Sequence, residues 1–180
     1  DGSGTIVISD GGSAPGLTAI RPAGSGTLTI GPNILIRGGY GQVGLSTLPT
    51  INLGTIRSDV SGRTITIVGT GWENQGTIQV ESGARLTTSG SWTNNSSVTG
   101  TSATLTLGGT WTNSGTIDVT TSSSLALDGT WSNLATISST NSTVDLGGTF
   151  DNAMLGTINI AGGQANITGT LNNSVLDITT

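Results

Sequence analysis

Several residue types on which enzymes rely are missing from this chain of 180 residues. It contains no cysteine, no histidine and no lysine. Without cysteine there is no disulfide framework and no thiolate metal ligand, and without histidine the Ser-His-Asp and Cys-His arrangements cannot form. Without lysine there is neither a phosphate-loop lysine nor a Schiff base. These absences exclude most familiar catalytic chemistries within the chain.

Charge and long apolar runs are also scarce. Charged residues make up 8% of the chain, and the formal net charge is −5. A nucleic-acid partner requires a dense basic patch, and a membrane-spanning helix requires ~20 consecutive apolar residues. Neither is present, so we expect no nucleic-acid partner and no membrane span. All the cations are arginines in the first half: Arg21, Arg37, Arg57, Arg63 and Arg85.

A large apolar residue followed two positions later by asparagine recurs six times in the chain. Successive pairs are separated by an almost constant interval of about 20 residues. A repeat this short cannot bury a face alone, so the repeats must stack on one another. The pairs are Trp72/Asn74, Trp92/Asn94, Trp111/Asn113, Trp131/Asn133, Phe150/Asn152 and Leu171/Asn173.

Alternating apolar residues fill the space between these pairs, as in Ile117/Val119 and Leu125/Leu127. Such alternation indicates strands with one buried face. Abundant glycine and β-branched residues disfavour helices. The sequence therefore predicts an all-β fold, a parallel β-helix (β-solenoid) of about eight coils. Each coil of ~20 residues holds about three short strands and rises by ~4.8 Å.

We interpret the two residues of each apolar–asparagine pair as having separate structural roles. The large residue points into the core, so that Trp72, Trp92, Trp111, Trp131, Phe150 and Leu171 form a core stack. The asparagines Asn74, Asn94, Asn113, Asn133, Asn152 and Asn173 form a hydrogen-bonded ladder at a corner, where asparagine tolerates the left-handed conformation. In a rival interpretation the tryptophans face outward as a sugar-stacking platform. The change from Trp131 to Phe150 to Leu171 favours the core, because a platform would lose its stacking chemistry.

The beginning of the chain repeats less cleanly than the rest. We predict that residues 1–69 form irregular coils with projecting loops, and that residues 70–180 form regular repeats of 19–21 residues in the same continuous solenoid. Segments 11–16, around Pro15, and 37–44 are the expected loops. Because binding residues concentrate on loops, Arg37, Tyr40 and Gln42 are the candidate recognition residues.

Carboxylates are the remaining route to catalysis. β-Helical polysaccharide lyases and hydrolases need several carboxylates close together, paired for acid–base work or shared on calcium. Here Asp118, Asp128, Asp145 and Asp151 fall at different places around the coil, with Asp128 and Asp145 the nearest pair. We predict no catalytic residue, no metal site and no cofactor.

The Thr-x-Thr elements at 27–29, 64–66 and 104–106 raise ice binding as another interpretation. An ice-binding face needs threonine at the same positions of consecutive coils. The corresponding segments 125–127 and 144–146 carry other residues. This array is therefore broken.

The units 109–117 (GTWTNSGTI) and 129–137 (GTWSNLATI) resemble repeats of bacterial filamentous-haemagglutinin-type secreted adhesins. Segment 28–38 is similar to strands of such exoproteins and of autotransporter passengers. The resemblance implies a right-handed parallel β-helix, a secreted or cell-surface setting, and a structural or adhesive role without catalytic residues.

The expected function is that of a segment of a bacterial fibre, stalk or adhesin. Its expected partners are neighbouring copies or flanking coils end to end, surface glycans, or a cell-surface receptor. A glycan-binding or glycan-cleaving β-helix is the alternative function.

Overall fold

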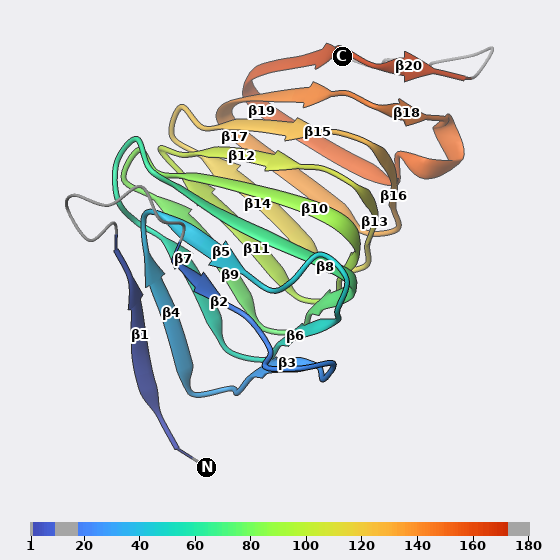
Figure 1. The fold of residues 1–180 in the computed structure, drawn as a ribbon. Coiled ribbons are helices and arrows are strands. Elements are labelled where there is room, and N and C mark those ends of the chain that lie inside the picture. The colour runs from blue at the N-terminus through green and yellow to red at the C-terminus, as the bar shows by residue number, and fades with distance from the viewer. Residues whose placement is uncertain (1, 10–17, 173–180) are drawn as a thin grey trace.

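The computed structural model describes residues 2–9 and 18–172, and all of its strands belong to one parallel sheet wound into stacked coils (Figure 1). The coils follow one another from β1, blue in Figure 1, to β20, red. Each coil contributes to three faces, and each face is a ladder of eight strand segments. Within the described residues the one helical segment is a 3-10 turn, Asn152–Met154. The predicted all-β parallel solenoid of eight coils is confirmed.

The three faces are named here after the residues that each sends into the core. The Ile face holds β1 (Gly4–Ile8), β4 (Ile34–Gly38), β7 (Thr55–Ser58), β9 (Thr77–Glu81), β11 (Ser97–Thr101), β14 (Thr116–Thr120) and the first parts of β17 (Thr136–Leu146) and β19 (Thr157–Ile167). The Leu face holds β2 (Ala19–Ile20), β5 (Gly41–Val43), the first parts of β8 (Thr64–Asn74) and β10 (Arg85–Asn94), then β12 (Thr104–Leu107), β15 (Ser124–Leu127) and the last parts of β17 and β19. The Trp face holds β3 (Leu28–Ile30), β6 (Thr50–Asn52), the last parts of β8 and β10, then β13 (Thr110–Asn113), β16 (Thr130–Asn133), β18 (Thr149–Phe150) and β20 (Thr170–Leu171).

The register on the Ile face shows how the coils differ in length. The longest step lies in the first coil, where Gly4 pairs with Ile34. From Leu35 onwards the coils are nearly uniform, at about 20 residues each. Leu35 pairs with Thr55 in the next coil. The residues equivalent to Thr55 in the later coils are, in order, Thr77, Ser97, Thr116, Thr136 and Thr157. The expected loop at 11–16, with Pro15, falls outside the described residues.

Segment 37–44 differs from the prediction of a loop that leaves the coil. Arg37 and Gly38 end strand β4, and Gly41 begins strand β5, so that only two residues turn the corner. Gly38 is buried and pairs in register with Ile8, and a Cβ atom on it would overlap the Ile8 carbonyl. The glycines that suggested a loop instead permit close packing between coils.

The large residues of the Trp face form a continuous stack inside the solenoid. Trp72, Trp92, Trp111 and Trp131 are only 1–3% exposed. Their ring centroids are 4.6, 5.0 and 5.8 Å apart in sequence order, and Phe150 follows at 5.0 Å from the last tryptophan. Leu171 pairs with Phe150 in register and is half-buried. The tryptophans therefore point inward and offer no sugar platform.

Each tryptophan also satisfies its polar atom inside the core. The indole Nε1 donates to a backbone carbonyl that precedes the next strand of the Trp face, as buried indoles generally require. The acceptors are Ser89 O for Trp72 (3.2 Å), Gly108 O for Trp92 (2.9 Å), Asp128 O for Trp111 (3.1 Å) and Gly147 O for Trp131 (3.0 Å).

Beside this stack runs a ladder of buried asparagine side chains. Each Nδ2 donates to the Oδ1 of the asparagine in the next coil, at 2.7–2.8 Å, from Asn52 through Asn74, Asn94 and Asn113 to Asn133. All are at most 1% exposed. The ladder starts one coil earlier than the repeat pattern indicated. The pattern missed Asn52 because Thr50 stands at the position taken by tryptophan in the next coil.

The predicted ladder bond from Asn133 to Asn152 is missing, which corrects that step of the prediction. Two residues are inserted after Asn152, and Asn152–Met154 form a 3-10 turn capped by Asp151, whose Oδ1 accepts from Met154 N (3.1 Å). The Asn133 Nδ2 donates instead to Leu155 O (2.9 Å). Asn173 lies outside the described residues.

The conformational reason expected for the asparagines is also wrong. Within the described part of the chain, no ladder asparagine has a positive φ. The non-glycine residues with positive φ lie at the corner between the Ile face and the Leu face: Ser82, Ser102, Thr121, Ser122 and Asn141. Asparagine recurs because its amide both donates and accepts inside the core.

Replacing one rung of the ladder tests its contribution. Asn94→Ala removes the acceptor of the Asn74 amide and the donor to Asn113, so buried polar atoms lose their partners. We expect the free energy of unfolding to fall by ~1–3 kcal/mol, measured by urea unfolding followed by circular dichroism. Asn95→Ala is the matched control, because this neighbouring side chain is exposed. Equal losses in the two variants would contradict a structural role for the ladder.

Candidate binding surfaces

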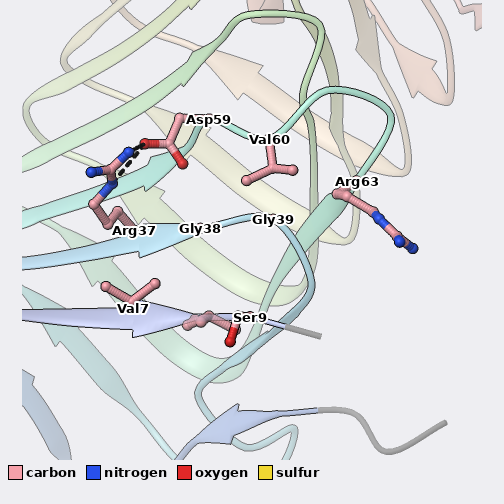
Figure 2. Close-up of a pocket in the computed structure, with 9 residues that line it drawn as sticks. Val7, Ser9, Arg37, Gly38, Gly39, Asp59, Val60 and Arg63 are labelled. Carbon is pink, nitrogen blue, oxygen red and sulfur yellow. Dashed lines mark hydrogen bonds and ion pairs between the residues drawn. The ribbon is translucent and has the colours of Figure 1, made fainter. Parts of the chain in front are cut away.

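A cavity of about 260 Å³ opens where the Ile face meets the Leu face in the first three coils (Figure 2). Strand β1 supplies Val7, strand β4 supplies Arg37, and the turn after β7 supplies Asp59, Val60 and Arg63. Residues far apart in the sequence meet here because each coil returns to the same corner.

An ion pair forms one wall of this cavity. The Arg37 guanidinium contacts Asp59 Oδ2 through its terminal nitrogen at 2.6 Å and through Nε at 2.8 Å. The Asp59 side chain is 5% exposed, whereas that of Arg37 is 48% exposed. The buried carboxylate therefore fixes a cation whose other side faces solvent.

A second cation and two apolar side chains complete the cavity. The Arg63 guanidinium carbon lies 6.0 Å from the centre of the Tyr40 ring, within the range of a cation–π contact. Val7 and Val60 are both exposed at the cavity. The walls thus combine an ion pair and a second guanidinium group with aliphatic surface.

The structure separates the three candidate recognition residues. Arg37 lines the cavity, and Tyr40 adjoins it through Arg63. Gln42 lies on β5 of the Leu face, where its Nε2 donates to Gly44 O (3.0 Å), and it does not line the cavity. Sequence reasoning missed Asp59, because its contact with Arg37 joins residues far apart in the chain and follows only from the coil register.

Of the carboxylates considered for catalysis, Asp128 and Asp145 lie in neighbouring coils, since Leu127 pairs with Leu146, and the others lie elsewhere. Asp118 is on the Ile face, and Asp145 is on the Leu face, where it accepts from Asn166 Nδ2 (2.7 Å). Asp128 follows the end of β15. In residues 2–9 and 18–172 no cluster of three or more metal-ligating side chains is found. The geometry offers no assembled carboxylate site.

A second cavity, of about 340 Å³, lies at the same kind of corner in the last three coils. Its side chains are polar and uncharged, and its serines take part in the coil's own hydrogen bonding, since Ser142 Oγ accepts from Ser123 N (3.0 Å). The lining residues are Ser122, Ser123, Asn141, Ser142, Thr143, Gly163 and Gln164.

These coils define the chain as a β-solenoid repeat protein. Comparisons with protein-family models, curated proteins and solved structures find no match. None of the described residues belongs to a helix long and apolar enough to cross a membrane. Any functional conclusion therefore rests on the sequence itself and on the geometry of the coils.

The ion pair of the first cavity can be tested against a more exposed one. Arg37→Ala leaves the buried Asp59 carboxylate without its cation, so we expect the free energy of unfolding to fall by ~1–3 kcal/mol. Arg57→Ala is the control: Arg57 Nε lies 3.8 Å from Glu81 Oε1, and both side chains are 33% exposed. Arg57→Ala should lower the free energy of unfolding by less than ~1 kcal/mol. A larger loss for Arg57→Ala, by denaturant unfolding, would contradict the assignment.

Proposed function

We propose that this chain is a non-catalytic structural and adhesive segment of a secreted or cell-surface bacterial fibre, stalk or adhesin. The observation that carries the proposal is the coil-to-coil register of the core side chains. Trp72, Trp92, Trp111 and Trp131 stack directly, and the asparagine ladder runs beside them. A chain whose core is one continuous column suits a rod better than a receptor with an enclosed site.

The direction of the hydrogen bonds supports a mechanical role. Every strand pairs in parallel with its equivalent in the next coil, so the backbone hydrogen bonds lie along the solenoid axis. To open one coil, all three of its ladders must break together. Eight coils at the usual strand spacing make a rod ~40 Å long. Such a rod resists bending, and it resists proteolysis because cleavage requires local opening.

The ends of the described solenoid support a partner that adds coils. Ile160 and Ile167 in the last coil are 37% and 48% exposed, although they belong to strands whose equivalents in inner coils are buried. Ile6 in the first coil is 45% exposed. We propose that a neighbouring copy, packed end to end, covers these side chains.

The extracellular setting is supported by composition and resemblance. The chain lacks cysteine and lysine and is only 8% charged. Typical soluble globular domains carry about 25% charged residues. The repeats at 109–117 and 129–137 also resemble those of secreted adhesins.

Glycan binding is the second candidate function, and the cavity at Arg37 and Arg63 favours it. An acidic sugar would place a carboxylate against one of the two guanidinium groups and its ring carbons against Val7 and Val60. Glycan cleavage lacks a comparable supporting observation, because Asp128 and Asp145, the nearest pair of carboxylates, line neither described cavity.

Small-angle scattering and limited proteolysis test the proposed rod. The scattering profile should fit a stiff, elongated particle, and residues 18–172 should survive protease treatment that digests the urea-unfolded chain. A flexible-chain profile, or rapid cleavage within the coils, would contradict the rod.

Titration calorimetry with polyuronate and neutral polysaccharides tests the second candidate. Saturable binding of a polyuronate that Arg63→Ala abolishes would favour the glycan function. Tryptophan fluorescence should stay unchanged in that titration, since all four indoles are buried. Absence of binding would leave the structural role as the better proposal.

A further inference from the structure

The outward side of the Trp face carries two columns of hydroxyl-bearing residues. The first column runs through successive register partners in five coils, and the second runs beside it in three coils. The first holds Ser91, Thr110, Thr130, Thr149 and Thr170, and the second holds Thr93, Thr112 and Ser132. In each row the residue between the two columns points inward, as Trp111 does between Thr110 and Thr112.

The positions of these hydroxyl groups repeat on a fixed grid. Two residues along a strand span ~6.7 Å, and neighbouring strands lie ~4.8 Å apart. The stacked indoles and the asparagine ladder hold the same strands from inside. Threonine is also stiff at χ1, so its methyl and hydroxyl groups keep their places without further ordering.

This surface carries no charge over its three complete rows. Glu73 occupies the second column one coil before the array, and Asp151 follows Phe150 one coil after it. Both described cavities are lined by residues of other faces and corners, and all four tryptophans point inward. A dissolved sugar needs a concave site or an aromatic platform, and an anionic ligand needs cations. The array fits neither class.

The Leu face provides a natural comparison. Its Thr104 and Thr106 point outward, but their register partners include Arg85 in the coil before and Ala126 in the coil after. Asp145 follows one coil further. The Thr-x-Thr elements of this face are therefore interrupted. The Ile face also has a hydroxyl column, from Thr55 to Thr157, but Gln79 and Asp118 stand in the column beside it. The array with two hydroxyl columns surrounds the tryptophans, where the large inward residue hides it in the sequence.

We propose that the hydroxyl array of the Trp face binds crystalline water, at the surface of ice. A rigid, flat grid of methyl and hydroxyl groups can hold first-shell water in a repeating arrangement and meet a lattice at many points at once. Charged groups would instead keep their water in a liquid-like shell. Ice would then be a solid surface to which the rod attaches, an activity beyond the structural role proposed above.

Ice-affinity partition tests this proposal directly. The fluorescently labelled chain is mixed with slowly growing ice, and the fraction in the ice is compared with that of a non-binding reference protein; thermal hysteresis is measured on the same samples. Thr112→Lys places a charge at the centre of the array. Thr106→Lys is the matched control, because it changes another half-buried, outward threonine of the same coil.

The original chain and Thr106→Lys should enter the ice, whereas Thr112→Lys should fall to the level of the reference protein and lose its hysteresis. Circular dichroism must show the same thermal midpoint for both variants. If the original chain is excluded from ice, or if both variants bind equally, the proposal is overturned. The rod is unaffected by that outcome, because scattering and proteolysis test it separately.

Discussion

The parallel register between successive coils is the constraint on which the rest of the structure depends. Because Thr110–Asn113 pairs in register with Ser91–Asn94, each side chain lies next to the side chain at the equivalent position of the neighbouring coil. A slip of one residue would turn the whole inward set outward. The register thus fixes in one step which residues form the core, which form the ladder and which face solvent.

The register also explains why the residue type varies along the core stack but not along the asparagine ladder. The core stack passes from Trp131 to Phe150 to Leu171, because each is apolar and large enough to cover the ring below it. The asparagine ladder has no such freedom. Each amide must donate to one neighbour and accept from the other, and a buried amide without partners is costly. Where the chain gains residues after Asn152, the ladder ends on the Leu155 carbonyl instead.

Much of the fold could be predicted from the sequence, because a repeat of about 20 residues with alternating apolar positions has few other solutions. The features that could not be predicted depend on local chain length or on register. Asn52 joins the ladder without a tryptophan beside it, and Asn152 leaves it because of an insertion. Glycines 38 and 41 suggested a loop, although they pack closely against the first coil. The Arg37–Asp59 pair and the hydroxyl columns appear only when the coils are superposed in the correct register.

Side-chain amide hydrogen exchange by nuclear magnetic resonance tests the central claim most directly, namely that one buried ladder runs in register through successive coils. The Nδ2 protons of Asn74, Asn94 and Asn113 should exchange far more slowly than those of the exposed Asn95, and they should become exchangeable together as denaturant opens the coils. Exchange of the ladder amides at the rate of Asn95 in the folded chain would contradict a continuous, in-register core.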